Sequence, residues 1–403
     1  MGSNMRVVRS SFGWRQVGVG AVVVGLLATA ACDRSSDEPV AGKFSPASVA
    51  SPSAPATTLS LTTPANKATK VTTSTALAFA TNGALGDVTL TGPDGKPVAG
   101  TLGGDKKTWV PSVQLAYGST YKVTAKAGDA SLASTFTTMA RPDSITGADL
   151  YVTDGQAVGV GLPIVVEFTR NIPVSQRAAV ERRLFVTSTP AVEGSWHWFS
   201  GGEVHYRPKA YWPVGTKISI RLAIGGLPMG NGHFGKRDRF ANITVGRSLV
   251  SKVYNKGKTM FVYKNGTLIR KFPISLGASA TPSSSGNLVA MQRASVLTFD
   301  SGTFGVPATS PGGYKEKVYW DVRYTWGGEF VHAAPWSIGS QGVRNVSHGC
   351  VNAAPSNAEW FYNASLIGDP IQIIGTGTRV KPGDGWTDWE LSWPQYVAGS
   401  ALH

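Results

Sequence analysis

The sequence is poor in cysteine. Cys32 and Cys350 are the only two cysteines among 403 residues, and they lie far apart in the chain. A framework of disulfide bonds is therefore excluded. A thiol that is left without a partner is either a reactive group or an inert buried one, so Cys350 requires an explanation of its own.

The chain also lacks, at its N-terminus, an apolar run long enough to span a membrane. Residues 17–31 are apolar and small, but they fall short of the roughly 20 residues that a spanning helix needs. Three arginines precede this run and small residues end it, which predicts a secretory signal over residues 1–31. Cys32 follows directly, where a bacterial lipoprotein carries its lipidated cysteine. We expect an exported protein that is anchored through Cys32 to the outer face of the cell membrane, facing the wall or periplasm, with cleavage without an anchor or an uncleaved segment as alternatives.

Charged residues are scarce, and acidic residues are the scarcest. Charged side chains make up 15% of the sequence, with 24 Asp and Glu against 38 Lys and Arg. The formal net charge is +14, and a chain without the three leader arginines would still be strongly basic. Such an excess either serves solubility or attracts an anionic surface such as lipid head groups, wall polymers or peptide carboxylates. No arrangement of aromatic and basic residues indicates nucleic-acid binding, and an exported protein is not expected to meet nucleic acid.

Low charge, 48 Gly and frequent Thr, Ser and Val predict a mostly β protein. Residues 32–56 are rich in Ser, Pro and Ala and predict a flexible tether. The stretch 117–125 alternates polar and apolar residues, and a similar stretch recurs at 214–222. Two copies about one hundred residues apart predict two immunoglobulin-like β-sandwich domains, residues 57–141 and 142–247.

A third β-rich unit is predicted over residues 248–376. Asn265-Gly266 lies between two strand-like runs and is a strong hairpin signal. Short helices are expected only at 357–365 in this unit and at 175–184 in the second sandwich domain.

The remaining residues, 377–403, are predicted to form a C-terminal subdomain that carries three tryptophans. Trp386, Trp389 and Trp393 are expected to cover a domain surface and bury apolar area. Stacking on sugar rings is the alternative.

Two histidines lie near Cys350 in the sequence. His332 begins the stretch His-Ala-Ala-Pro-Trp, and His348 lies two residues before the cysteine in Ser-His-Gly-Cys-Val-Asn. A thiol attacks as its thiolate and needs a neighbouring base or cation to form it. If the segment is extended, His348 and Cys350 share a face, whereas a turn at Gly349 separates them. Spacing therefore leaves open which histidine is the base.

Two other interpretations of these residues exist. Cys350 alone would fit an inert buried thiol. His332, His348 and Cys350 would also fit three zinc ligands, but no metal-binding helix motif accompanies them. We therefore expect no metal and no cofactor.

The stretch resembles the L,D-transpeptidase (YkuD-like) family. The family signature is a His, fourteen to seventeen residues, then Ser or Thr, His-Gly-Cys, an apolar residue and Asn or Arg. Here His332 is followed by fourteen residues and then by Ser347-His348-Gly349-Cys350-Val351-Asn352. Ser275-x-Gly277, Thr281-Pro282 and Gly286 are also similar to the first characteristic segments of the family. The leader, the two sandwich domains and the Trp-bearing tail resemble the large mycobacterial members.

The resemblance implies a role for each matching residue. Cys350 would be the acylated nucleophile and His332 its general base, oriented by a main-chain carbonyl. The N–H groups of Gly349 and Cys350 would form the oxyanion hole, and Tyr314 would add a hydroxyl donor from a lid. Residues that would line the substrate site are Tyr314, Trp336, Ser347, His348, Asn352 and Phe304, where some relatives have Tyr in place of Phe304.

The reaction implied by the resemblance is acyl transfer between peptidoglycan stem peptides. Cys350 would form a thioester with a donor tetrapeptide and release its terminal D-Ala, and an acceptor amine would then resolve the thioester to a 3→3 cross-link. Carbapenem-type β-lactams would acylate the same cysteine. The alternatives are an L,D-carboxypeptidase, a sortase-like cysteine transferase, and a wall-binding lipoprotein without activity.

Overall fold

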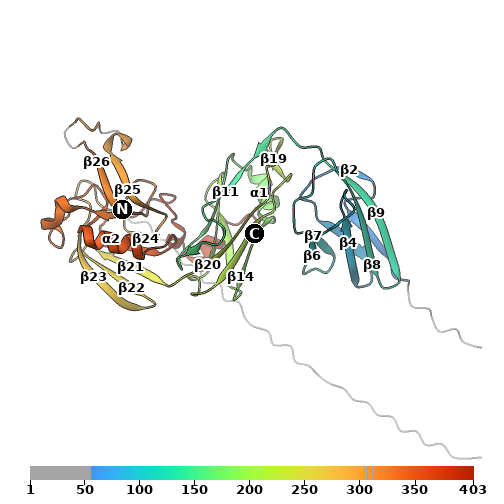
Figure 1. Ribbon diagram of the computed structural model, residues 1–403, viewed down its shortest axis with the longest axis horizontal. Helices are drawn as coiled ribbons and strands as arrows, with labels where there is room; N and C mark the ends of the chain where they lie inside the picture. The colour runs from blue at the N-terminus through green and yellow to red at the C-terminus, as the bar shows by residue number, and fades with distance from the viewer. Residues whose placement is uncertain (1–55, 305–306, 311–312) are drawn as a thin grey trace, which may run out of the picture. The chain divides into compact units, whose positions relative to one another are not determined.

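The structure is a computed structural model that describes residues 56–304, 307–310 and 313–403 (Figure 1). The side chains of Thr303 and Phe304 are not part of the description. The predicted signal segment, Cys32 and nearly all of the predicted tether lie outside the described residues. Within the described ranges, no helix combines the length and the apolar character needed to cross a bilayer.

The N-terminal part of the described chain is a β-sandwich with its own core. In β8 (Thr120–Ala127) the residues alternate strictly between exposed and buried, so that Tyr121, Val123 and Ala125 face inward. They pack with Phe136 of the adjacent strand and with Leu77 of the facing sheet. One sheet has the order β1 (Leu59–Thr63), β3 (Leu77–Thr81), β7 (Thr108–Pro111), β6 (Gly100–Leu102), and the other has the order β2 (Ala68–Val71), β9 (Ala130–Thr138), β8 (Thr120–Ala127), β4 (Leu85–Thr91), β5 (Pro97–Val98).

A second sandwich follows and repeats the motif. The predicted second copy forms β17, whose Ile218, Ile220 and Leu222 are buried, and both copies pair with the next long strand of their sandwich. The sheets have the orders β11 (Ala148–Leu150), β13 (Ile164–Phe168), β16 (Glu203–Pro208), β15 (Gly194–Trp198), then β12 (Ala157–Val158), β20 (Arg239–Val245), β17 (Lys217–Leu222), β14 (Leu184–Thr189), and β10 (Ile145–Thr146), β19 (His233–Gly235), β18 (Pro228–Gly230). The predicted helix is α1 (Val174–Glu181), which ends before β14 begins.

The third unit is a nine-stranded sheet that encloses a further apolar core. Its strand order is β24 (Gly286–Val289), β29 (Pro370–Ile374), β21 (Leu249–Tyr254), β22 (Thr259–Lys264), β23 (Thr267–Ser275), β28 (Val351–Ala353), β27 (Phe330–Ala333), β26 (Lys315–Arg323), β25 (Gln292–Asp300). The predicted hairpin joins β22 to β23, and Asn265 and Gly266 both have positive φ, as a tight two-residue turn requires. The predicted helix is α2 (Pro355–Ala364), which buries Ala358 and Phe361 in this core.

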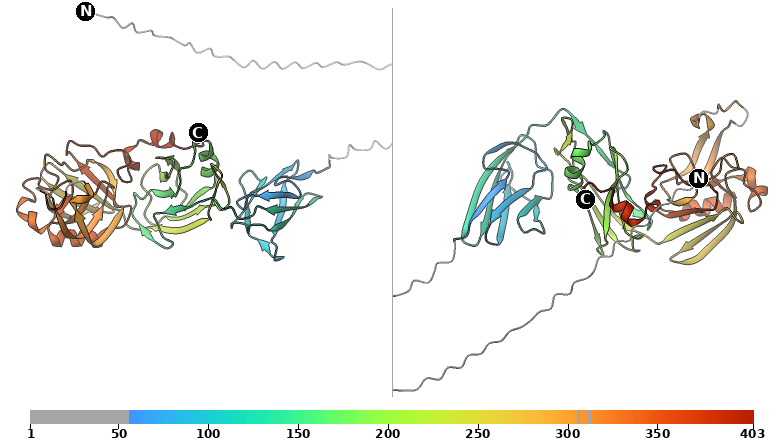
Figure 2. Two further views of the ribbon diagram at one scale, coloured as in Figure 1. Left: turned by 90° about the horizontal axis from the view of Figure 1, so that it is seen from above. Right: turned by 180° about the vertical axis from the view of Figure 1, so that it is seen from behind.

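The C-terminal segment packs on the second sandwich, and Figure 2 marks the C-terminus beside it. It contains η3 (Asp388–Glu390) and α3 (Trp393–Val397). Trp386 is buried in the core of the second sandwich, and Trp389 donates a hydrogen bond to the Gly161 carbonyl. Trp389 and Trp393 also stack on the buried guanidinium of Arg207, with ring centroids 4.5 and 5.4 Å away. The tryptophans therefore bury apolar area between two parts of the chain.

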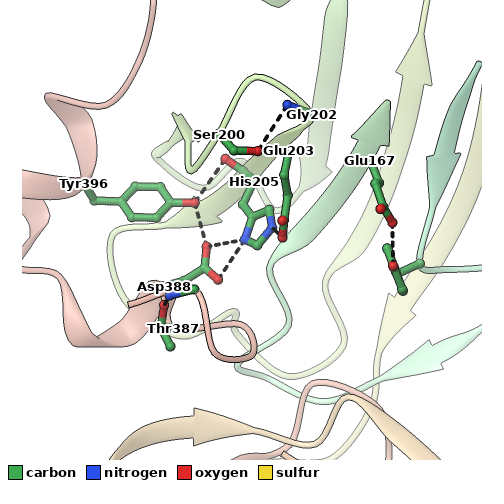
Figure 3. A network of polar contacts seen from close by, with 10 residues as sticks. Glu167, Ser200, Gly202, Glu203, His205, Thr387, Asp388 and Tyr396 are labelled. Atoms are coloured by element: carbon green, nitrogen blue, oxygen red, sulfur yellow. Dashed lines mark hydrogen bonds and ion pairs between the residues drawn. The ribbon is translucent and has the colours of Figure 1, made fainter. Parts of the chain in front are cut away.

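A buried polar network also holds this segment (Figure 3). His205 of β16 contacts Asp388 through Nδ1, 3.0 Å away, and Glu203 through Nε2, 2.7 Å away. Tyr396 donates to Asp388 at 2.9 Å. Burial alone would lower the pKa of His205, but the charges and hydrogen bonds of Asp388 and Glu203 outweigh it and raise this pKa to about 9.

The observed fold class is the predicted one: a mostly β chain with immunoglobulin-like sandwiches, a β-rich third unit and a short helical, Trp-bearing C-terminus. The residue numbers predicted as domain boundaries remain predictions. The core of the second sandwich includes Val289 and Met291 of the third unit, so these two units share a continuous interior.

Candidate active site

Two parallel strands bring the predicted base and nucleophile together. β27 pairs with β28 so that Val331 lies opposite Val351 and His332 lies opposite Asn352. Val331 and Val351 point into the core, so their neighbours His332 and Asn352 point to the other face of the sheet. Cys350 precedes Val351 and, two residues before Asn352, lies toward that same face. Neighbouring strands are about 4.8 Å apart, so the segments that carry Cys350 and His332 lie side by side.

A turn at Gly349 separates His348 from Cys350. Gly349 has φ +128°, a conformation that favours glycine, and a Cβ there would lie 3.2 Å from Glu329 Oε1. Ser347 closes the turn, because its Oγ donates to the Cys350 carbonyl at 2.7 Å and accepts from the Gly349 N–H at 3.2 Å. His348 is exposed, and its ring is tilted by 39° to that of Tyr314 with centroids 5.4 Å apart. The chain therefore directs His348 toward Tyr314, whereas His332 lies on the neighbouring strand.

The thiol of Cys350 is neutral in this arrangement. The residue is half-buried, and its Sγ donates to the Gly328 carbonyl at 3.6 Å. Burial raises the pKa of Cys350 to about 12. A main-chain hydrogen bond from Phe330 opposes this rise, while the nearby carboxylates of Glu329 and Asp321 add to it.

The imidazole of His332 is neutral as well. Burial lowers the pKa of His332 to about 4, against smaller opposing effects of hydrogen bonds with Ala333 and Asn352. Nδ1 lies 2.9 Å from the Ala333 carbonyl oxygen. A carbonyl can only accept, so Nδ1 carries the proton and Nε2 is left as the proton acceptor. The main-chain carbonyl expected from the family resemblance is therefore present, and its residue is Ala333.

Aromatic rings surround this imidazole. The ring of Phe299 meets His332 edge to face with centroids 5.3 Å apart, and the ring of Trp336 lies 6.0 Å away. Trp336, in η2 (Pro335–Ser340), is 55% exposed and so forms a wall that solvent can reach. Asn352 is buried and donates to Ser337 at 3.2 Å, which holds η2 against the strand.

Tyr314 lies at the end of the connection between β25 and β26. Its N–H donates to Ser301 Oγ at 2.8 Å. Burial raises the pKa of Tyr314, and the nearby Cys350 and Glu316 add to the rise. Phe304 ends η1 (Ser301–Phe304), and its side chain lies outside the described part of the structure.

The upstream segments of the family signature support the turn that carries Cys350. Ser275 Oγ donates to the Arg344 carbonyl at 2.8 Å and accepts from the Val346 N–H at 3.1 Å. Gly277 bridges to Ser347, and Thr281 donates to the Ser347 carbonyl at 3.1 Å. A Cβ on Gly277 would lie 2.1 Å from the Thr281 carbonyl oxygen, so only glycine permits this approach.

Three further residues beside the thiol were not identified from the sequence. Glu329 lies behind Gly349 and accepts hydrogen bonds from the N–H and Oγ of Ser284. Burial raises its pKa to about 7, although the bonds from Ser284 oppose this rise. Tyr324 is buried and donates to the Gly349 carbonyl at 3.3 Å. Asp321 is buried without a hydrogen-bond partner for either carboxylate oxygen, and burial raises its pKa to about 7. Of these three residues, only Glu329 had a signal in the sequence, because it is an isolated acidic residue directly before an apolar run.

The described residues contain no group of three or more His, Cys, Asp or Glu side chains placed to hold a metal ion. What the geometry supplies is a thiol and an unprotonated Nε2, with main-chain N–H groups at a glycine turn. These are the parts of an acyl-transfer site.

Comparisons with known proteins agree with this geometry. Residues 250–373 match the family model described as the L,D-transpeptidase catalytic domain, and residues 66–228 match a bacterial Ig domain. L,D-transpeptidase 2 of Mycobacterium tuberculosis (strain CDC 1551 / Oshkosh) is 37% identical over 327 residues, which cover 80% of this chain and 79% of that protein. The chain belongs to the L,D-transpeptidase family. The resemblance to this family is thus confirmed, and the protein is an enzyme of the cell wall.

A second curated relative and two solved structures also match the chain. L,D-transpeptidase 5 of M. tuberculosis (strain ATCC 25618 / H37Rv) is 35% identical, covering 78% of this chain and 70% of that protein. Among solved structures, the LD transpeptidase LdtMt1 in complex with imipenem is 34% identical and covers 57% of this chain and 100% of that chain, with a TM-score of 0.49. A further structure is an L,D-transpeptidase from Mycobacterium smegmatis, at 32% identity, 58% and 100% coverage and a TM-score of 0.47.

Proposed function

We propose that this L,D-transpeptidase forms 3→3 cross-links in peptidoglycan through an acyl-enzyme on Cys350. The thiol attacks the carbonyl between the third residue of a donor stem and its terminal D-Ala. The C–N bond breaks, D-Ala leaves, and a thioester remains. The side-chain amine of the third residue of a neighbouring stem, commonly diaminopimelate, then attacks the thioester and releases the thiol.

His332 is the proposed general base. The observation that carries this role is its tautomer, because the Ala333 carbonyl fixes the proton on Nδ1 and leaves Nε2 free to accept. Nε2 takes the proton of the Cys350 thiol during attack and delivers it to the departing amine of D-Ala. In the second half-reaction it takes a proton from the acceptor amine and returns one to the sulfur. The thiol now donates to Gly328, so it turns toward His332 when substrate binds.

The developing oxyanion is proposed to bind at the glycine turn. The N–H groups of Gly349 and Cys350 are the main-chain donors, and the Tyr314 hydroxyl adds a third from the side of the lid. The Gly349 N–H donates to Ser347 in the resting site and exchanges this bond for one to the oxyanion. Trp336, Ser347, His348, Asn352 and Phe304 are the residues proposed to contact or position the substrate.

Carbapenem-type β-lactams are proposed as covalent inhibitors. Their strained carbonyl offers the thiol the same attack that a stem peptide does, and opening of the ring leaves an acyl group on Cys350. The protein is further proposed to be exported and tethered by a lipid on Cys32, with the two sandwiches as spacers between membrane and wall.

Purified protein without residues 1–50, incubated with stem tetrapeptides, tests the proposal by mass spectrometry. A 3→3 linked dimer that is absent with Cys350→Ala supports cross-linking. Tripeptide without dimer would indicate an L,D-carboxypeptidase. Unchanged tetrapeptide with both proteins would leave a sortase-like or a binding role.

A further inference from the structure

The outer face of β21, β22 and β23 carries aromatic and basic side chains in alternation. Val253, Met260 and Phe272 point into the core of the third unit. Their neighbours point outward, so that the three strands present a row of five side chains on the opposite face. We name this row the basic-aromatic face, and its members are Lys252, Tyr254, Phe261, Tyr263 and Lys271.

The register of the strands places the ring of Phe261 between two cations. Phe261 of β22 lies opposite Lys252 on one side and opposite Lys271 on the other. Lys271 lies 5.2 Å from the centre of the Phe261 ring, and Lys252 lies 5.6 Å from that of Tyr263. The rings of Tyr254 and Phe261 meet at 88° with centroids 5.7 Å apart. Together with Lys256 and Thr259 they line a shallow hollow of about 390 Å³.

This face has no negative charge in its own strands. Residues 239–299 contain nine Lys and Arg and no Asp or Glu, although acids occur on both sides of this stretch. Among the ion pairs of the described residues, none involves Lys252, Lys256 or Lys271. Their charges are therefore available to an anionic partner, and unpaired cations on one surface raise the local concentration of such a partner.

The face is joined to the segment that carries the nucleophile. Asn255 directly follows Tyr254, and its Oδ1 accepts a hydrogen bond of 2.8 Å from Asn345. Asn345 also accepts from the Leu276 N–H at 3.2 Å and lies two residues before Ser347. The loop that follows β21 therefore contacts the segment that leads into the turn of Cys350.

We propose that the basic-aromatic face binds the glycan strand of peptidoglycan while one of its stems occupies the site of Cys350. This inference rests on the proposed function. Sugar rings present flat C–H surfaces that pack on aromatic rings, and the Tyr hydroxyls can bond their polar edges. The stems that hang from such a strand carry carboxylates, which complement the lysines. A shallow, extended surface suits a long polymer better than it suits a compact small molecule.

The test uses the full chain with Cys32→Ser, which prevents a lipid anchor. Lys252→Glu/Lys271→Glu reverses the charge of the face, and Lys122→Glu/Lys126→Glu, on exposed positions of β8, makes the same change in charge elsewhere. Binding is measured by co-sedimentation of Cys350→Ala forms with peptidoglycan sacculi and with phosphatidylglycerol vesicles. Active forms are assayed on intact sacculi and on soluble tetrapeptides, which carry no glycan.

We expect the Lys252→Glu/Lys271→Glu variant to lose about tenfold in affinity for sacculi, because steering by unpaired charge has this magnitude. Its cross-linking of sacculi should fall in parallel. Tetrapeptide dimerisation and the thermal midpoint should match the control. Unchanged binding of the variant to sacculi would overturn the proposal. Loss of binding to vesicles alone would also overturn it and would identify a lipid surface as the partner of this face. An equal loss with tetrapeptides would show that the face acts on the active site instead. Failure of the unaltered protein to dimerise tetrapeptides would reject the proposed function but not the binding result.

Discussion

The ionisation of Cys350 is the property of the site that is easiest to perturb, because pH changes it without a mutation. Burial raises the pKa of the thiol to about 12 and lowers that of His332 to about 4. At neutral pH both groups are therefore uncharged, and the resting site holds no thiolate–imidazolium pair. We predict that thiolate appears only in strongly alkaline solution.

The magnitude follows from these two values. A thiol with a pKa of about 12 is ionised to roughly one part in 10⁵ at pH 7, whereas an ordinary cysteine is ionised to a few per cent. Moving the proton from Cys350 to His332 costs at most about 11 kcal/mol, since the two pKa values differ by about 8, each unit is 1.36 kcal/mol, and attraction between the thiolate and imidazolium that form lowers the cost. A step of about 11 kcal/mol still permits on the order of 10⁴ events per second, so transfer during attack is fast enough for turnover.

Thiolate absorbance in the ultraviolet, recorded against pH for protein without residues 1–50, measures this directly. Cys350 is then the only thiol present, and Cys350→Ala supplies the baseline. Iodoacetamide should alkylate Cys350 about a thousandfold more slowly than it alkylates free cysteine at pH 7. A thiolate transition centred below pH 8, or alkylation at the rate of free cysteine, would refute the neutral resting pair.

Further predictions concern four other positions. His332→Ala should slow acylation by tetrapeptide or carbapenem by about 10³-fold, as loss of a general base does, with the thermal midpoint nearly unchanged; wild-type rates would indicate His348 as the base. Tyr314→Phe should slow acylation by less than this, and a larger effect would make the hydroxyl central. Burial raises the pKa of Asp321 to about 7, so the wild-type protein loses stability as pH rises from about 4 through that value. Asp321→Asn should therefore raise the free energy of unfolding, measured by denaturant titration, by about 4 kcal/mol at pH 8 and by little near pH 4. The raised pKa of His205, about 9, gives stability that is complete below pH 6.5 and is lost as pH rises to 9, so the thermal midpoint should fall between pH 6.5 and 9 in the wild type but stay flat in His205→Asn.

The parts of the fold that could be predicted are those encoded locally. Asn265-Gly266 specifies its hairpin because both residues tolerate positive φ. The alternation in β8 and β17 identifies a buried face without knowledge of the partner sheet. Cys350 and His332 were found through a motif, since their pairing depends on two strands that are nearly twenty residues apart in the chain.

The parts that could not be predicted depend on depth and on contacts between distant segments. Nothing in the sequence distinguishes the buried Asp321 of β26 from the exposed Asp87 of β4, because burial follows from sheets that pack only in the folded chain. The proposal of His332 and not His348 as the base likewise rests on the turn at Gly349 and on the tautomer fixed by the Ala333 carbonyl. The tryptophans of the C-terminus could be assigned to a surface, but not to the guanidinium of Arg207 on which they stack.

The carboxyls of Glu329 and Asp321 favour the neutral form of the Cys350 thiol. Both raise the pKa of Cys350, and so they oppose formation of the species that attacks. A thiolate is also the species that oxidants attack, so a thiol held neutral is protected in an oxidising compartment. The same carboxyls have pKa values of about 7 and give up their charge easily when a substrate excludes water. On the proposed mechanism, reactivity depends on His332 at the moment of attack and not on a preformed ion pair. Such a site favours a substrate that fills it over a small reagent that does not.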